Sequence, residues 1–144
     1  MTNRETPSRA TGHAAAGRDL LLLEDNPALA RVVASVAQAE GWQVHACVDA
    51  EQAVETLGQL RPMAAIVDCM LAEGSGLDVL GRLASAGREI PVLIVSGYGD
   101  TLLRLAEQTA ERCGLTRVAT QSKPFSAAAL RGFLQQAASE TGGS

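Results

Sequence analysis

The stretch LLLLEDNP, residues 20–27, joins an apolar run to two acids and a helix-starting Asn-Pro pair. Two later runs have the same form: AAIVD, residues 64–68, ends in an aspartate, and VLIVS, residues 92–96, ends in a serine. Short apolar runs separated by helical patterns are typical of a parallel sheet, whose strands are covered on both faces. Ligands bind such sheets outside the carboxyl ends of the strands. The sequence therefore predicts a cleft where acids and a hydroxyl converge.

Helical patterns fill the segments between these runs and complete five strand-helix units. A second strand is expected around Val44 to Val48, and a modest fifth one over Arg117 to Gln121, before Lys123. Helices are expected from Pro27 to Gly41, after Asp49, from Leu77, from Asp100 to Gly114, and after Ser126. Right-handed crossovers then favour a doubly wound, flavodoxin-like (βα)5 α/β fold with strand order 2-1-3-4-5.

Length and composition leave room for one domain in these 144 residues. We expect residues 1–17 to form a disordered leader, residues 18–138 the domain, and residues 139–144 a flexible tail. The net charge of -4 and the absence of a basic run argue against direct binding of nucleic acid. No apolar stretch approaches the length of a membrane span, so we expect a cytoplasmic protein without membrane contact.

Three carboxylates at the predicted cleft, those of Glu24, Asp25 and Asp68, would repel one another unless a cation neutralised them. Oxygen ligands without imidazole or thiolate indicate Mg²⁺, with Mn²⁺ as a second choice. Lys123 would add a fixed positive charge, and the Ser96 hydroxyl a hydrogen-bond donor. This group of side chains has the outline of a site that accepts a phosphoryl group.

The chain resembles response regulator receiver domains, the phosphoacceptor modules of two-component signalling, over roughly residues 18–138. Four motifs carry the resemblance in the same order along the chain, and they are LLLEDNP at residues 21–27, IVDCML at 66–71 with Gly76-Leu77, VSG at 95–97, and SKPF at 122–125. Each motif is weak alone. Four of them in this order, each at a strand end, make a specific combination.

The resemblance implies a role for each matching residue. Asp68 would accept the phosphoryl group from a phosphohistidine of a sensor kinase or a histidine phosphotransfer protein. Asp25, Asp68 and the backbone carbonyl of Met70 would bind Mg²⁺ directly, and Glu24 would bind it through water. In the same family, Ser96 matches the switch hydroxyl and Lys123 the lysine that pairs with the phosphoryl group, with a cis peptide bond before Pro124.

The resemblance further implies an output. Phosphorylation would change the surface formed by the helix from Asp100, the strand over 117–121 and the helix after Ser126. That surface would contact an effector or a fused output domain, or form a homodimer on phosphorylation. The segment between Ser96 and Lys123 is longer than in compact chemotaxis regulators and is similar to receivers fused to cyclic-di-GMP phosphodiesterase domains.

Four positions differ from the family pattern or tune its chemistry. Thr120 stands where a switch aromatic is common, so the coupled rotation of a Tyr or Phe is absent and the response is expected to be weaker or to use Tyr98. Met70 and Tyr98 flank the pocket and would screen attacking water, which predicts a phosphoform lasting minutes. Gly97 would leave the approach open to small phosphodonors.

Other classes fit less well. The leading interpretation is a signalling phosphoacceptor that catalyses only its own phosphorylation and dephosphorylation, and not a metabolic enzyme. A haloacid dehalogenase phosphatase requires a second aspartate where Met70 stands, and a flavin binder would meet the repelling pair Glu24 and Asp25. A receiver-like interaction module that works without phosphorylation stays open because of Thr120. Cys69, which follows the phosphoacceptor position, was expected to point to the opposite face and pack in the core.

Overall fold

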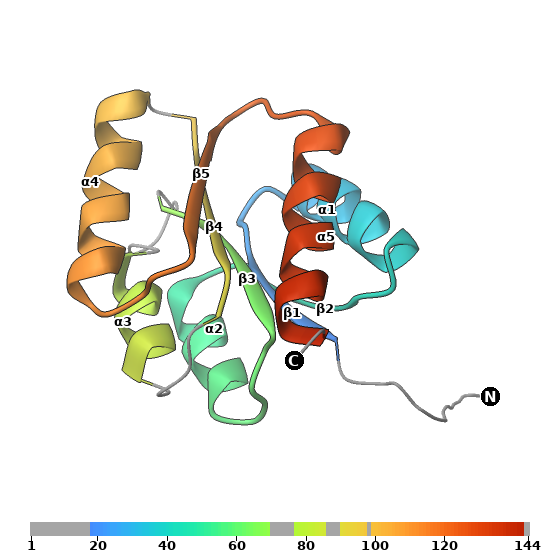
Figure 1. The fold of residues 1–144 in the computed structure, drawn as a ribbon, viewed down its shortest axis with the longest axis horizontal. Helices are drawn as coiled ribbons and strands as arrows, with labels where there is room; N and C mark the ends of the chain where they lie inside the picture. The colour runs from blue at the N-terminus through green and yellow to red at the C-terminus, as the bar shows by residue number, and fades with distance from the viewer. Residues whose placement is uncertain (1–17, 70–76, 86–89, 98, 143–144) are drawn as a thin grey trace.

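The computed structural model describes residues 18–69, 77–85, 90–97 and 99–142, and its centre is one five-stranded parallel sheet. The strand order is β2-β1-β3-β4-β5, as the sequence predicts (Figure 1). The strands are β1 (Asp19–Leu23), β2 (Gln43–Cys47), β3 (Ala64–Asp68), β4 (Val92–Ser96) and β5 (Val118–Ser122). The three apolar runs thus form the three central strands, and their carboxyl ends lie at one edge of the sheet.

Helices cover both faces of the sheet (Figure 1). The helices are α1 (Pro27–Ala39), α2 (Ala50–Leu57), α3 (Leu77–Ser85), α4 (Asp100–Arg112) and α5 (Ala127–Gly142). Side chains of α1 and α5 pack on the alternate strand residues that include Leu22 and Ile66. Side chains of α2, α3 and α4 pack on the other set, which includes Val67 and Ile94. We call these two sides the α1/α5 face and the α2/α3/α4 face.

Local signals in the sequence set the helix starts. The Asn26 side chain accepts hydrogen bonds from the backbone N–H groups of Ala28 and Leu29, which are otherwise without partners at the start of α1. Asp49 accepts from the N–H of Gln52, whose own side chain accepts from the N–H of Val48. This reciprocal pair is a capping box whose return bond goes to the residue before the N-cap.

Some predicted boundaries differ by a residue or more from the observed ones, and one predicted region lies outside the described residues. The strand expected over 117–121 lies at Val118–Ser122, because its backbone pairing continues to Lys123, whose N–H donates to the carbonyl of Ser96. Helix α5 continues through residues 139–142, past residue 138, where the expected domain ends. The expected leader, residues 1–17, lies outside the described residues.

Trp42 lies where α1 ends and β2 begins, at the amino ends of the strands. Its side chain is 3% exposed in the core of the α1/α5 face, and its indole N–H has no hydrogen-bond partner within the described ranges.

Each helix in the described part of the chain is too short or too polar to cross a lipid bilayer.

Candidate functional site

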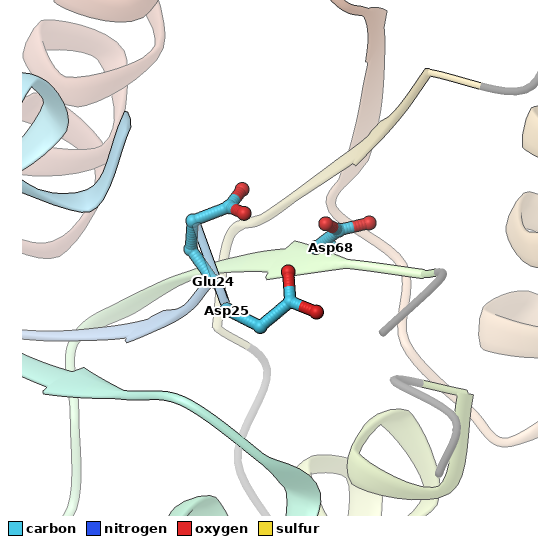
Figure 2. A group of neighbouring side chains, drawn as sticks. All are labelled: Glu24, Asp25 and Asp68. Atoms are coloured by element: carbon cyan, nitrogen blue, oxygen red, sulfur yellow. The ribbon is translucent and has the colours of Figure 1, made fainter. Parts of the chain in front are cut away.

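Three carboxylates meet beyond the carboxyl ends of β1 and β3. Glu24 and Asp25 directly follow the last residue of β1, and Asp68 is the last residue of β3, which pairs with β1. One carboxylate oxygen from each of the three lies within 4.8 Å of the others. Figure 2 shows the three side chains gathered at this end of the sheet, with the Asp25 and Asp68 carboxylates facing a shared space. The structure thus brings together the acids that the sequence places at strand ends.

The acids differ in their access to water. Glu24 and Asp68 are each 3% exposed, whereas Asp25 is partly exposed at the mouth of the cleft. Two buried carboxylates so close together require compensating positive charge, because a buried unpaired charge costs several kcal/mol, roughly, in free energy. The compensating positive charge comes from Lys123, which directly follows the edge strand β5.

Lys123 bridges the two buried acids. Its Nζ lies 2.9 Å from Oε1 of Glu24 and 2.9 Å from Oδ2 of Asp68. Burial lowers the pKa of the Lys123 ammonium, but the hydrogen bonds and charges of Asp68 and Glu24 outweigh burial and hold that pKa above its ordinary value. The lysine is therefore fully charged at neutral pH. The Lys123–Pro124 peptide bond is cis, as the sequence resemblance implies.

Glu24 is held on both of its carboxylate oxygens. Oε1 faces Lys123, and Oε2 accepts a hydrogen bond of 3.0 Å from the backbone N–H of Asn26. Its own backbone N–H donates to the carbonyl of Cys47 on β2. No local signal in the sequence predicts the pairing of Glu24 with Lys123, because the two residues lie far apart in the chain.

Ser96 ends β4 on the α2/α3/α4 face and is fully buried. Its side chain hydrogen-bonds the thiol of Cys69, which is also fully buried. Burial raises the pKa of the Cys69 thiol, the Ser96 bond opposes the rise by less, and the thiol stays protonated. Core packing of Cys69 is confirmed, but its contact with Ser96 was missed, although strand alternation after Asp68 could have revealed it.

The remaining predicted positions are spread around the cleft. Gly97 lies beside Lys123, and a Cβ added at Gly97 would lie 3.9 Å from that side chain, an ordinary contact. Thr120 lies in β5 opposite Ile94, three residues before Lys123, and is partly exposed. Met70 and Tyr98, expected to tune the chemistry, lie outside the described residues.

A groove opens beside the cleft, between α1 and the segment that leads into α5. Its volume is about 470 Å³, and its walls are Asn26, Ala28, Leu29, Val32, Lys123, Pro124 and Phe125. Val32 is 57% exposed, which is a large exposed fraction for an aliphatic side chain beside a charged pocket. We call this feature the α1 groove.

The donor set fits a hard divalent cation. Three carboxylates within mutual reach, with no imidazole or thiolate among them, are the ligands that Mg²⁺ and Mn²⁺ prefer. Asp25, partly exposed, has room for the water ligands that Mg²⁺ retains.

Comparison with known families identifies one that spans most of the chain. A family model described as the response regulator receiver domain matches residues 20–135. The chain is 34% identical over 91 residues to the probable transcriptional regulatory protein TcrX of Mycobacterium tuberculosis, covering 63% of this chain and 39% of TcrX. It is 30% identical over 123 residues to the transcriptional regulatory protein TrcR of the same species, covering 81% of this chain and 45% of TrcR. The match thus spans less than half the length of these relatives.

A solved structure resembles the chain in fold and sequence. The receiver domain of sensor histidine kinase PA1611 from Pseudomonas aeruginosa PAO1 superposes with a TM-score of 0.66 and 28% identity. The superposition covers 84% of this chain and 97% of that one. The crystal structure of that domain has a magnesium ion coordinated in its active site cleft.

Proposed function

This chain belongs to the response regulator receiver family, a family of signalling domains, and on that premise we propose that Asp68 accepts a phosphoryl group from a phosphohistidine. The observation that carries the proposal is the position of Asp68: a buried carboxylate at a strand end, ion-paired with Lys123 and surrounded by two further acids. A buried carboxylate with only a structural role needs a cationic partner such as Lys123, and gains nothing from two further acids beside it. The two further acids suit a divalent cation, which would offset the negative charge of an incoming phosphoryl group.

The transfer replaces one bond to phosphorus by another. A carboxylate oxygen of Asp68 attacks the phosphorus, the bond between phosphorus and the histidine nitrogen breaks, and the nitrogen keeps the electron pair and takes up a proton. The product is an acyl phosphate on Asp68. Lys123, already 2.9 Å from Oδ2, keeps its positive charge beside the added negative charge. The chain thereby promotes its own phosphorylation without acting on a separate metabolite.

We assign Asp25 and Asp68 as the main protein ligands of a Mg²⁺ ion, with the Met70 carbonyl as the expected third and Glu24 acting through water. When bound, the ion supplies positive charge to the phosphoryl oxygens. Glu24 has a second task in this proposal. Through its contact with Lys123 it fixes the ammonium group between the two strand ends.

The switch that follows phosphorylation involves Ser96 and Lys123. The added phosphoryl group draws the Ser96 hydroxyl toward Asp68, and the backbone after Ser96 leads directly to Gly97 and the start of α4. The surface of α4, β5 and α5 then changes and is recognised by an effector, an output domain or a second copy of the chain. Thr120 supplies no aromatic ring to this movement.

The phosphodonor is a protein, a sensor kinase or a histidine phosphotransfer protein, and the α1 groove is where it would dock. The groove includes Lys123 in its wall and an exposed apolar side chain, Val32, so that an apolar helix packed there would lie beside Asp68. We place the folded receiver unit at residues 18–138.

Incubation with acetyl phosphate and Mg²⁺, followed by intact mass measurement, tests the proposal. We expect one added phosphoryl group on the wild-type chain, none on Asp68→Asn, and one on the control Asp19→Asn, because Asp19 begins β1 at the opposite end of the strand from the acids. Labelling of Asp68→Asn would contradict the assignment. An unlabelled wild type, with a phosphorylated histidine phosphotransfer protein also ineffective, would favour an interaction module that works without phosphorylation, the reading that Thr120 supports.

A further inference from the structure

The ends of β3 and β4 direct their side chains to opposite faces of the sheet. Ile66 lies on the α1/α5 face and Val67 on the α2/α3/α4 face, so alternation places Asp68 on the first and Cys69 on the second. On β4, Ile94 shares the face of Val67, so Ser96 is directed to the α2/α3/α4 face as well. The phosphoacceptor and the switch hydroxyl therefore start from different sides of the sheet.

Cys69 is the neighbour that meets Ser96 on that side. The backbone N–H of Cys69 donates to the carbonyl of Val95 at 3.1 Å, which continues the pairing of β3 with β4 past Asp68 and fixes the two residues next to each other. Both side chains are fully buried, and the thiol and the hydroxyl share a hydrogen bond. The hydroxyl of a buried serine needs such a partner, because an unpaired buried hydroxyl is costly.

We propose that Cys69 is a positioning residue for the switch, whose thiol holds the Ser96 hydroxyl on the α2/α3/α4 face until a phosphoryl group on Asp68 draws it away. This inference rests on the proposed function and names a further residue that regulates the same site. One hydrogen bond is exchanged for another: the Ser96 hydroxyl leaves the Cys69 sulfur and donates to a phosphoryl oxygen. No covalent bond changes in this step.

The chemistry of a thiol suits this task. A thiol is a weak donor and a weak acceptor, so its bond to Ser96 satisfies the hydroxyl in the resting state and costs little to break. A hydroxyl at position 69 would strengthen this hydrogen bond to Ser96, and a methyl group would remove it. The residue that follows the phosphoacceptor thus sets how easily the switch hydroxyl moves.

Binding of beryllofluoride, a phosphoryl mimic, in the presence of Mg²⁺ measures how easily the Ser96 hydroxyl leaves the Cys69 thiol. The affinity for beryllofluoride is measured by titration calorimetry or fluorine NMR on the full chain. We expect Cys69→Ala to bind about two- to fivefold more tightly than the wild type, the lower part of the range of a net hydrogen bond. Cys69→Ser, which keeps the bond and strengthens it, is expected to bind more weakly than the wild type.

A control variant at Cys47 and a Ser96→Ala background distinguish a positioning role of Cys69 from an effect of packing. Cys47 is a comparable buried thiol on the same face, 3.5 Å from the Thr56 hydroxyl, so Cys47→Ala removes a thiol–hydroxyl contact that does not involve Ser96. We expect it to leave the affinity unchanged. In a Ser96→Ala background, the effect of Cys69→Ala should disappear, since the bond that it breaks is already absent. Thermal unfolding of every variant verifies that it is folded.

The outcomes distinguish this inference from the function it rests on. If the wild type binds beryllofluoride and both Cys69 variants bind it equally well, the positioning role is overturned and the phosphoacceptor function stands. If Cys69→Ala has the same effect with and without Ser96, the effect belongs to packing and the inference is wrong. A wild type that binds no beryllofluoride in Mg²⁺ overturns the proposed function, and the positioning role with it.

Discussion

The central strands and the edge strands of the sheet supply the site with different kinds of residue. All residues of β3 and β4 are buried, as are the last four of β1, whereas β2 and β5 are half exposed. The central strands end in the acids and Ser96, and the edge strand β5 leads into Lys123. The buried strands hold Asp68, the proposed phosphoacceptor, in a fixed place, and the edge strand leads to the lysine that is paired with it.

The largest expected difference between the two kinds of strand is in stability. Leu22→Ala on β1 removes a side chain that is 1% exposed, and we expect it to lower the free energy of unfolding by about 3 kcal/mol. Val44→Ala on the edge strand β2 removes a partly exposed side chain and should cost about 1 kcal/mol. Urea unfolding measures both. Equal losses would show that centre and edge contribute alike.

The acids at the central strand ends should differ in their effect on metal binding. Asp25→Asn removes the partly exposed acid that we propose as a direct ligand, and we expect Mg²⁺ affinity to fall by about 100-fold. Glu24→Gln, at a residue held by Lys123 and Asn26, should lower it by about tenfold, as an outer ligand does. Titration calorimetry with Mg²⁺ gives both affinities. A greater loss for Glu24→Gln would reverse the assignment of direct and water-mediated ligands.

Removing the positive charge of Lys123 should leave the repulsion between Glu24 and Asp68 without compensation. Lys123→Met leaves Glu24 and Asp68 without their shared cation, and we expect a loss of about 1–2 kcal/mol of unfolding free energy, less than for a fully buried pair. The control Arg131→Met, on the exposed side of α5, should change stability by less than about 0.5 kcal/mol.

The pH dependence of that loss has a definite sign. The pKa of Lys123 is raised by folding, so its contribution is complete below the ordinary value of 10.5 and declines as pH rises through the higher folded value. The stability gap between wild type and Lys123→Met should therefore be constant between about pH 8 and pH 10 and narrow only above that range. A gap that narrows near neutral pH would contradict the ion pairs.

The smallest expected effect is the response of β5 itself. With Thr120 in place of an aromatic residue, we expect beryllofluoride to change hydrogen exchange strongly at Gly97 and the first turn of α4 and only weakly over Val118 to Gln121. Thr120→Tyr should extend the change into β5. Exchange measured by mass spectrometry, with and without the mimic, distinguishes the two. Strong protection of β5 in the wild type would show that the signal passes without an aromatic relay.

The sequence predicted the centre of the molecule better than its edges. Continuous apolar runs identify β1, β3 and β4 because both faces of these strands are covered. Val48 was expected to alternate with Val44 as part of the second strand, yet it lies beyond the end of β2 and is 50% exposed. Hydrophobic periodicity gives the side of a strand that is buried, but tertiary pairing decides where the strand ends.

The site residues at the ends of the central strands were likewise easier to predict than the contacts that depend on how strands pair. The positions of Glu24, Asp68 and Ser96 follow from strand ends that the sequence reveals. The bridge from Lys123 to Glu24 depends on where β5 joins the sheet, and no spacing in the chain encodes it. The contact between Cys69 and Ser96 depends on the register of β3 with β4, in which Asp68 lies opposite Val95.

The buried indole of Trp42 is a fluorescent reporter that lies at the opposite edge of the sheet from the acidic cleft. It is the only tryptophan in the chain, and its N–H group is shielded from water at the amino ends of the strands, the far edge from the acids. Its emission should therefore be blue-shifted in the folded chain and shift to the red on unfolding. Because the cleft lies at the opposite edge, metal and phosphoryl mimics should leave that emission nearly constant. Tryptophan fluorescence then reports folding alone, and the proposed switch has to be followed with other probes.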